Sequence, residues 1–309
     1  MKLESCALPV FAILAMSLSV RAQDPAFRFL ATGDLPYSAD QESQYRRLLK
    51  QSEGEDFQFL MHVGDFKAGS APCSNNEFTK IRDLFQAYSK PVVYTPGDNE
   101  WTDCHSVGRD PVERLDKLRE LFFKDPQTLR LGQLGAHHQS MEPQYAKYVE
   151  NYRFIRSGVL FIVAHVVGSG NNYRADHPPS MTEFHGRTAA NLAFLNESFA
   201  VAVARNVRAV AIVIHANPDF EKGAGVGFQQ FLATMRAFLP EYRRPVICIH
   251  GDSHYFRIDK PFKDSARKTF LHFTRVEVFG SPNVAGLAVT VDPYDPQVFS
   301  YRPYYLVDK

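Results

Sequence analysis

Three apolar runs in the first third of the chain end in the same dipeptide, and this recurrence constrains the fold more than any other feature of the sequence. The runs span residues 27–32, 57–63 and 91–95. They are followed by Gly33-Asp34, Gly64-Asp65 and, after a proline, Gly97-Asp98. Short runs rich in β-branched and aromatic residues predict buried strands, and Gly-Asp predicts a turn. The pattern therefore predicts a mainly parallel sheet whose strands deliver polar loops to one edge.

Segments with helical spacing separate these strands, as expected for successive βα units. Helices are expected over about residues 39–51, 75–88 and 111–124. Ser38 and Gln41 form a capping-box pattern at the start of the first helix. Asp110 followed by Pro111 is a typical start for the third. The first third of the chain thus has the alternating order of an α/β protein.

The rest of the chain continues with strands and helices, interrupted by two stretches without clear periodicity. Strands are expected at 152–155, 159–166, 209–214, 246–249, 270–278, 285–291 and 298–304, and helices at about 188–205 and 228–239. Residues 125–150 are expected to form a loop and residues 168–172 a flexible polar loop. Because no internal repeat, low-complexity block or linker is present, residues 23–309 are expected to form a single domain.

Composition and the first residues bound the location and the partners. Of the 309 residues, 35 are Lys or Arg and 34 are Asp or Glu, and this balance argues against nucleic acid as a partner. Lys2, the apolar run 7–20 and Ala22 predict a signal peptide over residues 1–22 and a secreted or periplasmic protein. A membrane anchor is the alternative, but about 14 apolar residues are short for a span of ~20, so no membrane span is expected after cleavage.

Export makes the cysteines informative, because disulfides persist in oxidising compartments. Cys73 and Cys104 both lie in loops just after Gly-Asp motifs, and we expect them to pair. Cys248 lies inside an apolar strand-like run and is expected to be a small buried side chain.

Polar side chains at the ends of the predicted strands form the candidate site. In chain order they are Asp34, Asp65, Asp98 with Asn99, His215, and Asp252 with His254. Because the carboxyl ends of parallel strands meet at one edge, these side chains are expected to converge. Carboxylates and imidazoles that converge repel one another or stay unpaired unless a cation lies among them. The sequence therefore predicts one or two divalent cations.

These motifs resemble, in order, those of the calcineurin-like metallophosphoesterases. The resemblance extends over about residues 27–256 and is carried by Gly33-Asp34, Gly64-Asp65, Gly97-Asp98-Asn99-Glu100, Ile214-His215 and Gly251-Asp252-Ser253-His254. It implies an α/β fold, an αββα sandwich of two mixed sheets flanked by helices, with a dinuclear metal centre. It further implies that Asp34 and His254 hold the first metal, that Asp65 bridges both, and that Asp98, His215 and Asp252 hold the second.

The chain departs from the family motifs at three positions. Pro36 stands where the family usually has a histidine, Asp98-Asn99 replaces the usual Asn-His, and Asp252 replaces a histidine. Four aspartates supply enough negative charge to neutralise two divalent ions before any hydroxide binds. An oxygen-rich ligand set also favours Mn²⁺, Mg²⁺ or Ca²⁺ over Zn²⁺.

Other polar residues near the motifs have weaker signals. Asn99 occupies the family's leaving-group histidine position, and His105, after Cys104, is the substitute acid that the sequence offers. Lys67 and Arg257 flank two motifs as candidates for phosphate binding, with solvated surface charge the equal alternative. For Tyr37, packing against the helix cap is favoured over a role at the site. Glu100 is expected to hold a supporting hydrogen bond.

Two functions from different classes remain open on the sequence. The first is a secreted metal-dependent phosphoesterase that hydrolyses a small phosphomonoester or phosphodiester by attack of a hydroxide held between two metals. The second is a catalytically weak or inactive, metal-stabilised binding protein on the same fold. The completeness of the convergent set favours the first, and the altered motifs favour the second.

Overall fold

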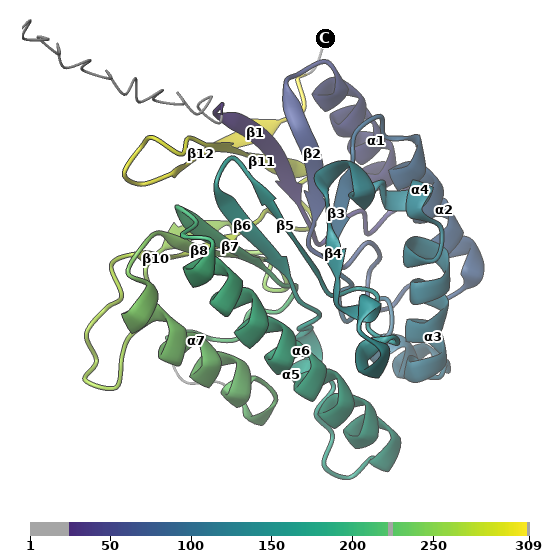
Figure 1. The fold of residues 1–309 in the computed structure, drawn as a ribbon. Coiled ribbons are helices and arrows are strands. Elements are labelled where there is room, and N and C mark those ends of the chain that lie inside the picture. The colour runs from purple at the N-terminus through teal and green to yellow at the C-terminus, as the bar shows by residue number, and fades with distance from the viewer. Residues whose placement is uncertain (1–24, 222–224, 308–309) are drawn as a thin grey trace, which may run out of the picture.

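The computed structural model describes residues 25–221 and 225–307, which form two β-sheets packed face to face between helices (Figure 1). The αββα sandwich of two mixed sheets expected from the sequence is confirmed. The predicted signal peptide, residues 1–22, lies outside the described residues. No helix in the described part of the chain is long and apolar enough to cross a membrane.

The first sheet contains both ends of the described chain. Its order is β12 (Phe299–Tyr305), β11 (Ala285–Val291), β1 (Phe27–Thr32), β2 (Phe57–His62) and β3 (Val92–Tyr94). β1, β2 and β3 are parallel, and β11 and β12 are antiparallel to their neighbours. Helices α1 (Ala39–Glu53) and α2 (Asn75–Ala87) connect the parallel strands and lie on the outer side of this sheet (Figure 1).

The second sheet is built from the rest of the chain. Its order is β4 (His137–His138), β5 (Tyr152–Arg156), β6 (Val159–Val163), β7 (Ala209–Val213), β8 (Val246–His250), β10 (Phe273–Glu277) and β9 (Arg257–Asp259). β6, β7, β8 and β10 are parallel. Helices α6 (Pro178–Ala204) and α7 (Gln229–Tyr242) cover its outer face (Figure 1).

Short helical segments fill the connections. They are α3 (Pro111–Leu118), a π-helical turn (Arg119–Phe123), α4 (Pro126–Leu129), α5 (Gly168–Asn171), and 3-10 turns at Thr102–Val107, Leu131–Leu134, Gln139–Met141, Pro143–Tyr145 and Val226–Phe228. The predicted cap of α1 is present, because Ser38 Oγ accepts from the backbone N–H of Gln41 at 3.2 Å. The Gln41 side chain reaches one residue further back than in a standard capping box and accepts from the N–H of Tyr37 at 2.8 Å.

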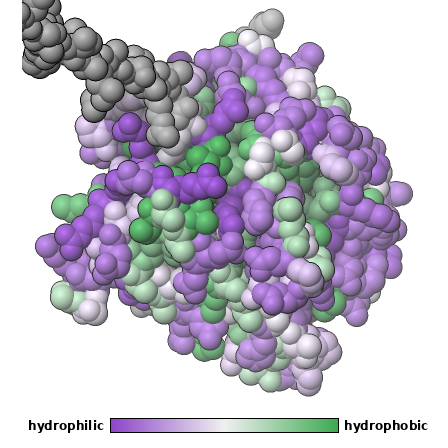
Figure 2. All heavy atoms as spheres, viewed as in Figure 1, coloured by the Kyte–Doolittle hydropathy of each residue, from purple (hydrophilic) through white to green (hydrophobic). Residues whose placement is uncertain are grey.

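Two apolar layers hold the sandwich together. One lies between the sheets and under α1 and α2, and the other lies between the second sheet and helices α6 and α7. Phe29 stacks on Phe59 with ring centroids 4.8 Å apart, and Phe161 meets both rings edge-on. Every residue of β6, β7 and β8 is buried, as expected for strands covered on both faces. The face seen in Figure 2 is mostly hydrophilic, with hydrophobic atoms showing mainly near its centre.

The structure differs from the sequence prediction where tertiary contacts outweigh local pattern. Helix α6 begins at Pro178, about ten residues earlier than predicted, because His177 caps it and prolines occupy its first turn. Residues 125–150, expected as a loop, contain α4 and the short strand β4. Residues 168–172, expected as a flexible loop, form a compact turn in which Asn171 and Asn172 are buried.

Candidate metal centre

Loops from both sheets meet at one edge of the sandwich and carry all six predicted ligands. Asp34, Asp65 and Asp98 follow β1, β2 and β3 of the first sheet. His215 follows β7, and Asp252 and His254 follow β8, in the second sheet. The six residues lie where the parallel strands of two sheets end, so the convergence expected from the sequence is present in space.

Within the described residues, the ligand atoms form two groups that share His215. The nitrogen and oxygen atoms of Asp34, Asp65 and His215 lie within 4.8 Å of one another, as do those of Asp98, His215 and Asp252. His254 Nε2 lies 3.9 Å from Asp34 Oδ1, at the edge of the first group. The second group is the same as the second ligand set implied by the resemblance. The resemblance assigns His215 to that set alone, but in the structure His215 also lies close to Asp34 and Asp65.

Unusual backbone conformations aim these side chains at the centre. Asp34, Asp65, Asp252 and His254 all have left-handed conformations, with φ of 52°, 56°, 77° and 56°. For residues other than glycine this costs of order 1–3 kcal/mol each, and such residues cluster at functional sites. Residue 97 must be glycine because there is no space for a side chain: a Cβ there would overlap Asp65 Oδ1 and the Asp65 backbone nitrogen.

Backbone carbonyls fix the orientation of both imidazoles. His215 Nδ1 donates to the Val63 carbonyl oxygen at 2.7 Å, which turns Nε2 toward the carboxylates. Nε2 then lies 2.7 Å from Asp98 Oδ1 and 3.5 Å from Asp65 Oδ1. His254 Nδ1 likewise donates to the Ser281 carbonyl oxygen at 2.9 Å. In metal-binding histidines, one ring nitrogen typically donates to a carbonyl or carboxylate oxygen in this way and the other binds the metal.

Hydrogen bonds also hold the carboxylates. The N–H of Asn99 donates to Asp65 Oδ1 at 3.0 Å, and the N–H of Asp252 donates to Asp34 Oδ1 at 2.9 Å. Buried Glu100 accepts from the backbone N–H groups of Asp65 and Gly97, at 2.9 and 3.0 Å from Oε1. Glu100 thereby ties the second and third motifs together, the supporting role expected from the sequence.

The electrostatics of the cluster show an excess of buried negative charge. Burial raises the pKa of Asp34 to about 8, against the opposing charge of His215, and raises the pKa of Asp65 well above its usual range. Burial alone would lower the pKa of His215, but the surrounding carboxylates raise it well above its usual value. Burial alone would raise the pKa of Asp98, but the hydrogen bond from His215 and its charge hold that pKa below its usual value. A metal ion bound among these carboxylates would therefore displace protons from them.

The residues present fit a pair of divalent cations. Four carboxylates supply hard oxygen ligands, and both imidazoles turn Nε2 toward them. Asp98, His215 and Asp252 would hold one ion. Asp34 and Asp65 would hold the other together with an imidazole.

Tyr37 lies at the site, although packing was the favoured interpretation of the sequence. Its hydroxyl donates to Asp65 Oδ2 at 2.9 Å, lies 3.2 Å from His254 Nε2 and accepts from Asn99 Nδ2 at 2.9 Å. Burial, followed by the charge of Asp65, raises the pKa of Tyr37 far above its usual range, so the phenol is neutral. The sequence signal for this role is that Tyr37 directly follows Pro36, the position at which the family usually has a histidine.

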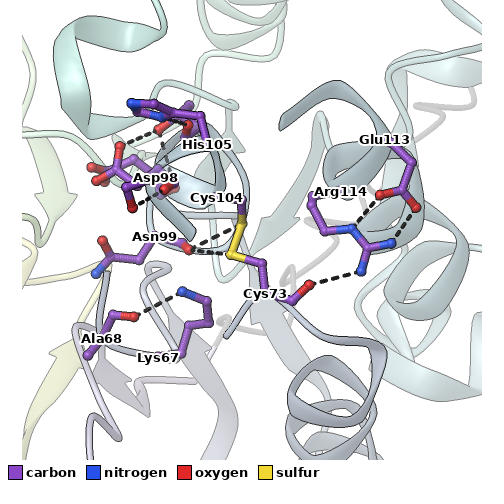
Figure 3. The surroundings of a disulfide bond; sticks show 12 residues. Lys67, Ala68, Cys73, Asp98, Asn99, Cys104, His105, Glu113 and Arg114 are labelled. Carbon is purple, nitrogen blue, oxygen red and sulfur yellow. Dashed lines mark hydrogen bonds and ion pairs between the residues drawn. A yellow bond between two sulfur atoms is a disulfide. The ribbon is translucent and has the colours of Figure 1, made fainter. Parts of the chain in front are cut away.

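The predicted disulfide between Cys73 and Cys104 is present and lies beside the backbone of Asn99 (Figure 3). The Cα atoms are 5.7 Å apart, and both sulfur atoms approach the Asn99 carbonyl oxygen, at 3.7 and 3.8 Å. The Asn99 side chain points away from the disulfide (Figure 3). Its Nδ2 donates to the Tyr37 hydroxyl. The disulfide therefore supports the backbone of the third motif.

The remaining predicted residues lie in different surroundings. Lys67 is buried, and its Nζ donates to the Ala68 carbonyl oxygen at 2.9 Å; burial lowers its pKa. Arg257 donates to buried Glu277 at 2.6 Å. His105 is exposed, and its Nδ1 donates within its own turn to the Thr102 carbonyl oxygen at 2.8 Å. The catalytic and substrate-binding roles of these three residues stay predictions.

Behind the site, His165 is buried and makes stability depend on pH. Its Nδ1 lies 2.9 Å from Glu150 Oε1, and its Nε2 has no partner among the described residues. Burial lowers the pKa of His165 to about 4, so the folded protein binds fewer protons than the unfolded chain between pH 6.5 and 4. The stability contributed by neutral His165 is complete above about pH 6.5 and is lost as the pH falls toward 4.

We therefore expect the free energy of unfolding to decrease by about 3 kcal/mol from this residue between pH 7 and 4. Urea unfolding of the chelator-treated protein at several pH values measures it. A His165→Gln variant, which retains a donor for Glu150, should show a flatter pH dependence by that amount. Parallel profiles for the two proteins would contradict the assignment.

Comparisons with known proteins place this geometry in a family. A family model described as calcineurin-like phosphoesterase matches residues 27–256. A search of curated protein sequences gives no significant match. Similar solved structures include a dimetal phosphatase from Danio rerio (13% identity, TM-score 0.53, covering 92% of this chain and 100% of that one). The fold is shared by a purple acid phosphatase from yellow lupin, with 12% identity and a TM-score of 0.52, covering 91% of this chain and 54% of that one. It is also shared by GAP50 of Plasmodium, described as the anchor in the inner membrane complex, with 12% identity and a TM-score of 0.51, covering 92% of this chain and 90% of that one.

Proposed function

Because the chain belongs to the calcineurin-like phosphoesterase family, we propose that it hydrolyses a small phosphomonoester or phosphodiester with the help of two divalent cations. The observation that carries the proposal is the placement of His215 Nε2 among carboxylates delivered by both sheets. A cluster of this charge, with pKa values raised by burial, is costly to keep in a fold unless cations neutralise it.

The ligand roles that we propose are those implied by the family resemblance, and the two groups of ligand atoms support them. Asp98, His215 and Asp252 would hold one ion, Asp34 and His254 would hold the other, and Asp65 would contact both. When bound, the ions supply a nucleophile at neutral pH and stabilise negative charge on the phosphoryl oxygens. Because the ligands are rich in oxygen, Mn²⁺, Mg²⁺ or Ca²⁺ suits the site better than Zn²⁺.

The chain's own residues orient the substrate and the leaving group. Neutral Tyr37 and Asn99 form a hydrogen-bonded pair at the side of the site where Asp65 accepts a bond from Tyr37. The Asn99 amide has a further N–H, which can donate to a leaving-group oxygen but cannot transfer a proton to it. Proton delivery therefore falls to water, to His105 after movement of its turn, or to the substrate, and we expect substrates with good leaving groups to react fastest.

Two further parts of the proposal concern substrate contact and location. Lys67 lies two residues after Asp65 and offers N–H donors beyond the one directed at Ala68, which supports a contact with a phosphate oxygen. Arg257 would bind phosphate only after breaking its hydrogen bond to Glu277 and donating to the phosphate instead. The disulfide supports a secreted or periplasmic location for residues 23–309 as one domain.

Turnover of aryl phosphate mono- and diesters by the chelator-treated protein tests the proposal. We expect no hydrolysis without metal and restored hydrolysis with added Mn²⁺, Mg²⁺ or Ca²⁺, more strongly than with Zn²⁺. An Asp65→Asn preparation purified in the same way measures the contaminating background. Hydrolysis that is equal in the two preparations for every metal would support the alternative, a metal-stabilised binding protein on the same fold.

A further inference from the structure

The turn formed by residues 168–172 lies against the second ligand group from outside. Ser169 Oγ lies 2.8 Å from Asp98 Oδ2 and 2.7 Å from Asp103 Oδ1, within hydrogen-bond distance of both. Gly168 fits only because it has no side chain, since a Cβ there would overlap Asp98 Oδ1 and Asp252 Oδ1. The turn thus touches two of the three residues of this group.

The turn has a left-handed backbone over four consecutive residues. Ser169, Gly170, Asn171 and Asn172 have φ values of 47°, 65°, 57° and 62°. Glycine and asparagine tolerate this conformation as single residues, but a run of it is unfavourable without outside support. Something outside the turn must therefore hold it in place.

Arg187 of helix α6 supplies that support from below. The fully buried guanidinium donates from Nη1 to Asn171 Oδ1 at 2.6 Å and from Nη2 to the Asn171 carbonyl oxygen at 2.9 Å. Its remaining N–H groups bond the His165 carbonyl oxygen and Glu183, so all donors of the guanidinium are used. Glu183 also accepts from Asn172 Nδ2 at 2.8 Å. The turn is anchored at both of its asparagines.

We infer that Ser169 is a positioning residue that fixes the Asp98 carboxylate for metal binding, and that Arg187 holds the turn which presents it. The inference rests on the proposed function, because it concerns the ion held by Asp98, His215 and Asp252. Asp98 Oδ1 faces His215, so a hydroxyl that holds Oδ2 fixes the rotation of the carboxylate and the direction of Oδ1. Supporting bonds of this kind typically change metal affinity 10–100-fold.

A glycine substitution separates this role from a structural one. Ser169→Gly removes the hydroxyl and suits the left-handed backbone, so the melting temperature should stay the same or rise. Ser157 is a matched control, because it has the same residue type and φ of 46° in the β5–β6 turn, at the opposite end of β6. We expect Ser169→Gly to weaken one of two Mn²⁺ binding steps at least about tenfold in calorimetric titration, and Ser157→Gly to change neither.

A second pair of variants excludes backbone flexibility as the cause. Ser169→Ala and Ser157→Ala remove the same hydroxyls and keep a Cβ, and the same tenfold loss is expected only at position 169. Mn²⁺ affinity within twofold of wild type in Ser169→Ala would overturn the inference, even if Ser169→Gly binds more weakly. If the wild-type protein itself binds no Mn²⁺, it is the proposed function that fails.

Discussion

Replacing Asp65 by asparagine is expected to reduce metal-dependent turnover at least about 10³-fold, the largest effect on activity that the structure predicts. Asparagine tolerates the left-handed backbone at φ 56° and keeps the acceptor for Tyr37, but it removes the charge that lies between the two ligand groups. Loss of about 4 kcal/mol of transition-state stabilisation corresponds to this factor.

Turnover of an aryl phosphate at saturating metal, with kcat and KM measured separately, is the appropriate readout. Asp83→Asn on helix α2 is the matched control, because this exposed aspartate pairs with neighbouring Arg82 on the same helix. It should retain wild-type turnover. Retention of more than about a tenth of the activity in Asp65→Asn would remove this residue from the centre of the mechanism.

The largest expected effect on stability comes from the ion pair beneath the turn. Arg187 and Glu183 are both buried and are joined by bonds of 2.7 and 3.1 Å. Removing one partner of a buried pair leaves a buried charge without compensation and typically costs about 3–5 kcal/mol. We expect Glu183→Leu to lower the free energy of unfolding by this amount in urea titrations.

Two comparisons sharpen the result. The double variant Glu183→Leu/Arg187→Met removes both charges and should recover part of the loss. The Asn171 carbonyl then loses its bond from Arg187, whereas the His165 carbonyl still accepts from Asn191 Nδ2. Arg46→Met breaks a partly exposed pair with Glu42 and should cost less than about 1 kcal/mol. A loss in Glu183→Leu no larger than that in Arg46→Met would contradict the assigned role of the pair.

The sequence predicted the parts of the site that depend on local order along the chain. Asp34, Asp65 and Asp98 could be found because each follows an apolar run, and a parallel sheet brings such strand ends together. His215 and Asp252 follow from the same reasoning applied to the second half. The disulfide followed from two cysteines placed just after these motifs, and the structure confirms it.

The remaining parts depend on contacts between residues far apart in sequence. Tyr37 looked like a packing residue because only the fold brings Asn99 and His254 to its hydroxyl. Ser169 lies in a Gly-Ser-Gly-Asn-Asn stretch, whose composition indicates a flexible loop. The buried Arg187 that orders this stretch is 18 positions further along the chain, on helix α6, and the predicted start of that helix at about residue 188 did not include it. Left-handed conformations at four candidate ligands likewise have no signal in residue type, apart from the tolerance of aspartate.

Anomalous diffraction from crystals equilibrated with Mn²⁺ would locate the proposed ions. Two peaks about 3.5–4 Å apart are expected. One should lie among Asp98, His215 and Asp252, the other should contact Asp34, and Asp65 should lie between them. A single peak elsewhere on the protein, or no peak at this edge of the sandwich under conditions that support hydrolysis, would contradict it.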